Sequence, residues 1–180
     1  MPVLKLVAPD AEILRKCTEN IGHRITKAEH KSLSDMEKTL RSMPDAIALA
    51  APQVGIPLRA FVVRSNDDFE AVLNPHIEWT SIHDANEIIL GEGNAPLPRI
   101  TSFWERCLSF PGREFLVDRP YIATIKFKNI KGVERKVSYQ AWPARVVLHE
   151  IAHLDGILVE NISSASRDIP EDDDAEIWRF

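Results

Sequence analysis

Cysteine is scarce in this sequence: its 180 residues include only Cys17 and Cys107. A chain of this length buries enough apolar surface to fold without disulfide bonds, which argues against a small disulfide-rich scaffold and favours a single compact domain. In a cytosolic chain of this size, a metal-binding or catalytic role is a common reason for a cysteine. We interpret Cys17, near Ile13 and Leu14, as a small core residue.

Long apolar runs and an excess of positive charge are also absent. No run approaches the roughly 20 apolar residues that a membrane-spanning helix needs. The N-terminus lacks the apolar segment and cleavage site of a secretory signal, so we expect a cytoplasmic protein. With 22 basic and 27 acidic residues, the net charge is −5, which argues against a nucleic-acid-binding surface. We therefore expect neither a membrane nor a nucleic acid as a partner.

Helical and strand patterns alternate along the chain. Apolar residues spaced three or four apart predict a helix over 32–43, which Pro44 ends. β-Branched and aromatic runs predict strands at 58–64 and 71–75 and a hairpin across 121–141. The long polar segment from Pro75 to Arg106 is either a partly structured insertion or a mobile flap.

Several candidate metal-binding and catalytic residues lie in a predicted helix that begins near Pro143 and ends at Gly156. His149 and His153 are four residues apart, so they share one helix face and can bind one metal ion, with Glu150 beside them as a general base. A catalytic metal usually has three protein ligands, so a third is expected elsewhere. The candidates are His23, His30, His76, His83 and Cys107, and a buried, inert role is the alternative for the cysteine.

Three segments resemble, in order and spacing, the signature motifs of peptide deformylases. They are IALAAPQVG at Ile47–Gly55, ERCLS at Glu105–Ser109 and LHEIAHLDG at Leu148–Gly156. The resemblance implies an α+β fold in which antiparallel strands surround a central helix that carries the HExxH motif. We expect residues 1–162 to form a single catalytic domain and residues 163–180 to form an acidic, flexible tail.

The resemblance also implies an activity: removal of the N-terminal formyl group from nascent proteins that begin with formyl-methionine. It implies that Cys107, His149 and His153 bind one divalent metal ion, ferrous iron in vivo with zinc or nickel as alternatives. Glu150 is then the general base, and the Gln53 side chain and the Leu108 backbone N–H stabilise negative charge on the formyl oxygen. The expected partner is a formylated peptide N-terminus bound by a monomer. The expected substrate-binding residues are Ile47, Ala48, Arg106, Trp142, Arg145 and Val146.

The motifs depart from the family pattern at several positions. Ala46 and Ala48 stand where the family usually has glycine, and Arg106 replaces the glycine before the cysteine. Leu148 and Ala152 replace a glutamine and an aspartate that support the metal ligands in the family. These departures keep two alternatives open: a metallohydrolase of the same fold with another N-acyl or peptide substrate, and a catalytically weakened homologue that binds peptides.

Arg145 allows a sharper hypothesis. It lies four residues before His149 and therefore on the same helix face. If its guanidinium faces the pocket, the preferred residue after the formyl group is polar or acidic rather than methionine. The alternative is that Arg145 extends to solvent or pairs with a carboxylate.

Overall fold

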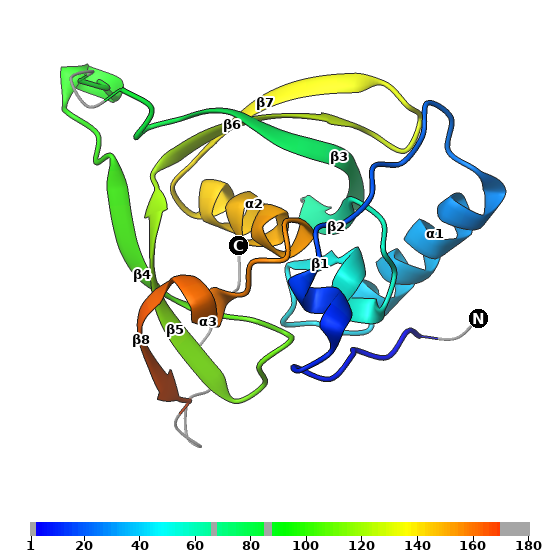
Figure 1. Cartoon of the computed structure of the whole chain (residues 1–180). Helices are drawn as coiled ribbons and strands as arrows, with labels where there is room; N and C mark the ends of the chain where they lie inside the picture. The colour runs from blue at the N-terminus through cyan, green and yellow to red at the C-terminus, as the bar shows by residue number, and fades with distance from the viewer. Residues whose placement is uncertain (1–2, 66–67, 85–87, 170–180) are drawn as a thin grey trace.

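The computed structural model describes residues 3–65, 68–84 and 88–169, and its strands form two antiparallel sheets (Figure 1). The five-stranded sheet has the order β1 (Ala48–Ala50), β2 (Ala60–Ser65), β3 (Asp68–Thr80), β6 (Ile122–Lys128) and β7 (Glu134–Gln140). The three-stranded sheet has the order β4 (Ile100–Arg106), β5 (Arg113–Pro120) and β8 (Ser163–Asp168). This arrangement confirms the predicted α+β class. No helix in the described ranges has the length and apolar character required to cross a membrane.

Helix α2 (Ala141–Leu154) contacts strands of both sheets, β1, β6 and β7 on one side and β5 on the other. Figure 1 shows it beneath the long curved strands β3, β6 and β7 and beside β4 and β5. Its buried Val147, Ile151 and Leu154 pack against Phe61 and Ile125 of the five-stranded sheet. Each buried side chain of this kind contributes roughly 1.5–3 kcal/mol, so this apolar face fixes the helix against the sheet.

Helix α1 (Lys27–Arg41) begins five residues earlier than the apolar pattern predicts. The Thr26 hydroxyl accepts a hydrogen bond from the Glu29 backbone N–H, and the Glu29 carboxylate accepts one from the Thr26 N–H. This capping box starts the helix one turn before its apolar face. The buried residues Leu33, Met36 and Leu40 then pack in the same cluster as residues of β1, β2 and β3.

Short helices connect these elements. Three are single 3-10 turns, and α3 follows α2 after a tight turn at Gly156. Their bounds are η1 (Glu12–Arg15), η2 (Ala51–Val54), η3 (Glu92–Asn94) and α3 (Val159–Ile162). Gly156 has a φ of 73°, and a Cβ there would lie 2.8 Å from the Arg15 carbonyl carbon, so only glycine fits this turn.

Two sequence predictions need correction, those for residues 163–168 and for Cys17, and the structure favours one of the two alternatives for the segment from Pro75 to Arg106. Residues 163–168, predicted to lie in a flexible tail, form β8 and pair with β5, whereas residues 170–180 lie outside the described part of the chain. The segment from Pro75 to Arg106 is partly structured, because β3 extends to Thr80 and β4 begins at Ile100. Cys17 is exposed and lies outside any helix, so it is not a core residue.

Candidate active site

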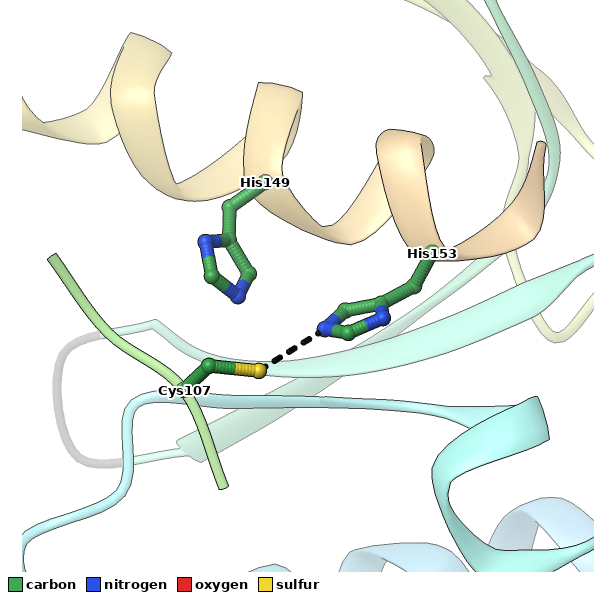
Figure 2. A group of neighbouring side chains, drawn as sticks. All are labelled: Cys107, His149 and His153. Carbon is green, nitrogen blue, oxygen red and sulfur yellow. Dashed lines mark hydrogen bonds between the residues drawn. The ribbon is translucent and has the colours of Figure 1, made fainter. Parts of the chain in front are cut away.

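Cys107, His149 and His153 converge between the end of β4 and one face of α2 (Figure 2). One ligand atom of each residue lies within 4.8 Å of the others, and the Cys107 Sγ is 3.2 Å from the His153 Nε2. In residues 3–65, 68–84 and 88–169, this is the one group of three or more side chains with metal-binding geometry. Of the candidates for a third ligand, Cys107 belongs to this group, and His23, His30, His76 and His83 lie outside it.

The pKa shifts of Cys107 and His149 bear on the binding of a metal ion. Burial raises the pKa of the Cys107 thiol, but the charge of His153 and hydrogen bonds with both histidines outweigh it and bring that pKa well below its usual value. Burial lowers the pKa of His149, but hydrogen bonds with Cys107 and Glu105 outweigh it and raise that pKa to about 10. A thiolate beside two imidazoles is a donor set that iron, zinc and nickel accept. The residues therefore fit a divalent metal ion whose binding displaces the ring proton that faces the thiolate.

Glu150 lies next to this group on α2 and is only 5% exposed. Its Oε2 has no hydrogen-bond partner among the described residues. Burial raises the pKa of Glu150, and the nearby histidines offset only part of that rise. A buried carboxylate that faces a cavity without a protein partner is available to exchange a proton with a bound reactant.

Gln53 is held by both ends of its amide. Its Oε1 accepts a hydrogen bond of 2.8 Å from the Ala50 N–H. Its Nε2 donates to the Ser109 hydroxyl at 3.2 Å and lies 3.7 Å from the Cys107 Sγ. These contacts aim the amide N–H groups at the candidate metal site. Ser109 was not predicted as a site residue, although it closes the ERCLS motif.

Glu105 orients His149. This carboxylate is 1% exposed and accepts two hydrogen bonds from Arg119, at 2.7 and 2.9 Å. Its Oε2 lies 2.8 Å from the His149 Nδ1. The carboxylate therefore favours a proton on Nδ1 and leaves Nε2 of His149 available to a metal ion. Burial raises the pKa of Glu105, but the hydrogen bonds from His149 and Arg119 outweigh it and lower that pKa.

Neither Glu105 nor Arg119 was predicted from the sequence as a site residue. Glu105 had a signal, because it stands two residues before Cys107 in a motif that was already identified. Arg119 had none, because it reaches Glu105 only through the pairing of β4 with β5.

A cavity of approximately 410 Å³ opens in front of these groups. Gln53, Leu108 and Glu150 line it, as do all the residues expected to bind substrate: Ile47, Ala48, Arg106, Trp142, Arg145 and Val146. Ala46 and Ala48 are also in its wall, and neither has a positive φ, so methyl groups at these positions cause no backbone strain.

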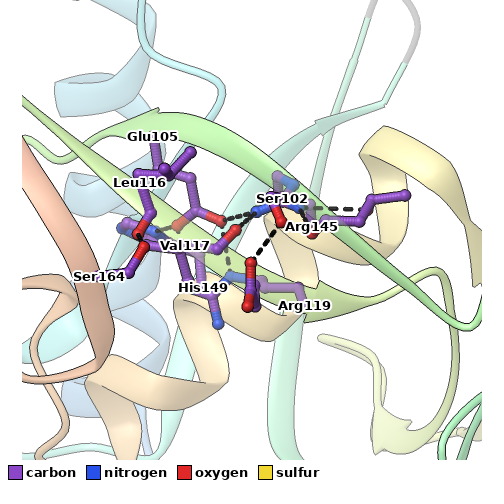
Figure 3. A network of polar contacts seen from close by, with 10 residues as sticks. Ser102, Glu105, Leu116, Val117, Arg119, Arg145, His149 and Ser164 are labelled. Atoms are coloured by element: carbon purple, nitrogen blue, oxygen red, sulfur yellow. Dashed lines mark hydrogen bonds and ion pairs between the residues drawn. The ribbon is translucent and has the colours of Figure 1, made fainter.

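Arg106 and Arg145, two of the three arginines in the cavity wall, are engaged with carboxylates. Arg106 donates a 2.8 Å hydrogen bond to Glu114, and Arg145 donates a 2.6 Å hydrogen bond to Glu105. Arg145 is only 4% exposed, and its other donors bind carbonyl groups of β4 and β5 (Figure 3). The guanidinium is therefore turned toward the protein, which removes the basis for an acidic substrate preference.

Leu148 and Ala152 stand where the family usually has a glutamine and an aspartate that support the metal ligands. Leu148 packs against Ala123, Ala144 and Tyr139 and makes no polar contribution. The Nδ1 of His153 has no hydrogen-bond partner within the described residues. His149 thus keeps Glu105 as its orienting partner. His153 is 1% exposed and is held by packing.

Comparisons with known proteins agree with this geometry. The profile of the polypeptide deformylase family matches residues 3–168. A peptide deformylase of Leptospira biflexa is 35% identical over 162 residues, which cover 88% of this chain and 86% of that protein. A peptide deformylase of Symbiobacterium thermophilum is 31% identical and covers 98% of this chain and 76% of its own length.

Solved structures give the same result. The peptide deformylase of Synechococcus elongatus in complex with actinonin superposes with a TM-score of 0.77 at 28% identity, over 92% of this chain and 81% of that one. The peptide deformylase of Thermotoga maritima superposes with a TM-score of 0.76 at 27% identity, over 92% of this chain and 100% of that one. The chain therefore belongs to the polypeptide deformylase family and is a metallohydrolase that removes N-terminal formyl groups.

Proposed function

We propose that Cys107, His149 and His153 bind the catalytic metal ion and that Glu150, Gln53 and the Leu108 backbone N–H carry out the deformylation of formyl-methionyl peptides. The observation that carries this proposal is the convergence of the three ligand side chains beside the buried Glu150, whose Oε2 has no hydrogen-bond partner in the described part of the chain. When bound, the metal ion would act as a Lewis acid that lowers the pKa of the attacking water, so that this water can lose a proton at neutral pH.

Glu150 accepts a proton from the attacking water as the new carbon–oxygen bond forms at the formyl carbon. The developing negative charge on the formyl oxygen is stabilised by the Gln53 side-chain N–H, which Ala50 and Ser109 hold in place, together with the N–H of Leu108. Glu150 then delivers its proton to the amine nitrogen as the carbon–nitrogen bond breaks. The products are formate and a peptide with a free N-terminus.

The cavity wall supports a substrate with an apolar first side chain. Trp142 and Val146 line it, and the charges of Arg106 and Arg145 are paired with Glu114 and Glu105. We propose that the methionine side chain of the substrate binds against Ile47, Ala48, Trp142, Val146 and the aliphatic stem of Arg145. Arg106 flanks the peptide beyond that side chain.

We also propose which metal the site binds, the oligomeric state and location of the protein, and the extent of its catalytic domain. The thiolate ligand supports ferrous iron in vivo, with zinc or nickel as alternatives. We propose a cytoplasmic monomer with a single catalytic domain. Its boundary moves from residue 162 to at least residue 168, since β8 belongs to the three-stranded sheet.

The metal site can be tested by measuring metal content and formate release together. Removal of the metal with a chelator is expected to abolish formate release from formyl-Met-Ala-Ser, and ferrous iron added without oxygen is expected to restore it. Cys107→Ala and His153→Ala are expected to lose both metal and activity. Full activity after complete metal removal would contradict the proposal.

A further inference from the structure

Arg145 adds a second guanidinium to the carboxylate that orients His149 (Figure 3). Its Nη1 donates to the Glu105 Oε1 at 2.6 Å and to the Val117 carbonyl at 2.9 Å. Its Nη2 donates to both the carbonyl and the hydroxyl of Thr101. One side chain of α2 therefore ties Glu105 to strands β4 and β5.

The acceptor positions of Glu105 are filled symmetrically. Oε1 accepts from the Arg119 Nε and the Arg145 Nη1, and Oε2 accepts from the Arg119 Nη2 and lies 2.8 Å from the His149 Nδ1. With two partners on each oxygen, rotation of the carboxylate breaks several charge-assisted hydrogen bonds at once. Arg145 and His149 are one turn apart on α2, so the helix holds Glu105 from both sides.

Stability alone does not explain this arrangement. Arg119 already pairs with Glu105 through two hydrogen bonds, and Arg145 places a second buried cation beside a site that receives a divalent cation. Burying a charge costs free energy, and a buried ion pair is often no more stabilising than an apolar side chain of similar volume. The bonds of Arg145 to Val117 and Thr101 fix its guanidinium, and the remaining bond holds the Glu105 carboxylate in place.

We propose that Arg145 is a positioning residue for the metal ligand His149, acting through Glu105. Its Nη1 holds the carboxylate, the bonds to Val117 and Thr101 hold the guanidinium, and the carboxylate fixes the ring orientation and tautomer of His149. This role rests on the metal site proposed above, and it extends the support of that site to a residue on the same helix as the ligands.

The test is metal affinity, measured on apo-protein by competition with a chelator for Zn²⁺. Arg145→Met removes the guanidinium, and Arg145→Lys keeps the charge but cannot reach Glu105, Val117 and Thr101 together. Both variants are expected to weaken Zn²⁺ binding by about 10–100-fold, the usual effect of removing a group that orients a metal ligand. The absorption bands of the Co²⁺-loaded variants are expected to shift from those of the wild type, because the His149 ring is no longer fixed.

Arg64→Met is the matched control. Arg64 donates to the carbonyls of Leu40, Met43 and Ala46 and contacts no metal ligand. Its replacement removes a similar set of backbone-directed hydrogen bonds. We expect lower stability with an unchanged Zn²⁺ affinity and an unchanged Co²⁺ spectrum, which separates a loss of fold from a loss of positioning.

A double-mutant cycle with Glu105→Gln decides whether Arg145 acts through Glu105. In that background, Arg145→Met is expected to change Zn²⁺ affinity by less than about twofold. Circular dichroism at the assay temperature identifies the folded variants. If Arg145→Met does not fold, Arg145→Lys is used in its place. The proposal is overturned by wild-type Zn²⁺ affinity in Arg145→Lys, or by an equal effect of Arg145→Met in both backgrounds. Failure of the metal site itself gives a different result: a wild-type protein that binds neither Zn²⁺ nor Co²⁺.

Discussion

At the scale of single residues, Gln53 illustrates how a common side chain is given a specific task. On a surface turn it would be a solvated amide, but here it is 2% exposed and both ends of the amide are held. Because Ser109 and Ala50 fix its orientation, the N–H groups point toward the proposed metal site without reorganisation during the reaction.

We predict that Gln53→Ala lowers kcat for formyl-Met-Ala-Ser by about 10²–10³-fold, the usual cost of removing one donor to a developing oxyanion. Metal content is expected to stay at the wild-type level, because Gln53 is not a ligand. Ser109→Ala is the matched control, since it removes a support of Gln53 but leaves the donor, and a smaller loss is expected. A wild-type kcat in Gln53→Ala would exclude this role.

The pairing of Arg145 also predicts substrate preference. Its donors are occupied by Glu105, Val117 and Thr101, so it has no cationic group to offer an acidic side chain in the cavity. We predict that kcat/KM for a formyl-Met peptide exceeds that for the matching formyl-Glu peptide by at least about tenfold, as an apolar pocket discriminates. Equal or faster cleavage of the formyl-Glu peptide would show that the guanidinium faces substrate.

At the scale of secondary-structure elements, the start of α2 is strained. Ala141 has a φ of 54°, in the left-handed region that favours glycine. We predict that Ala141→Gly raises the free energy of unfolding by about 0.5–1 kcal/mol, since relief of the strain exceeds the added entropy of the unfolded chain. Urea denaturation measures the change, and Ala144→Gly in the same helix is expected to destabilise by about 1 kcal/mol or more. Destabilisation by Ala141→Gly would contradict this account of the turn.

The three-stranded sheet contains a buried ionic group with a predictable pH dependence. Glu114 on β5 is 1% exposed and bonds to Arg106 of β4 and Arg167 of β8. Burial raises the pKa of Glu114, but the hydrogen bonds from Arg106 and Arg167 outweigh it and hold that pKa below its ordinary value of 4.5.

Because the pKa of Glu114 is lower in the folded state, its stabilising effect is fully present above about pH 4.5 and is lost as the pH falls through the folded-state pKa. Glu114→Gln is therefore expected to lower the free energy of unfolding by roughly 1–3 kcal/mol at neutral pH. The difference from wild type should shrink in acid. Denaturation at several pH values checks this, and a difference that stays constant down to pH values below the folded-state pKa would refute it.

The sequence predicted some elements well and missed others for physical reasons. The helix that carries His149 and His153 was predicted because its start near Pro143 and its end at Gly156 are local features. Strands β4 and β5 were not predicted, because they lie among glycines, prolines and charged residues. Their identity as strands depends on pairing with each other and with β8.

At the scale of the whole molecule, the fold brings together motifs that are far apart in the chain. Helix α2 lies against both sheets, which places Gln53 of η2, the end of β4 and His149 around one cavity. The proposed metal ligands, together with Glu150 and Gln53, were predicted from three ordered motifs. The network of Glu105, Arg119 and Arg145 was not, since it exists only once β4, β5 and α2 are packed together.

The most direct test of the central claim is formate release by Glu150→Gln and wild-type protein, both purified without oxygen, loaded with ferrous iron and analysed for metal content. The account predicts that each protein holds one metal ion and that wild-type protein cleaves formyl-Met-Ala-Ser at least about 10²-fold faster, the typical contribution of a general base. Formate release at equal rates by the two proteins, or none by wild-type protein with a full complement of iron, would contradict it.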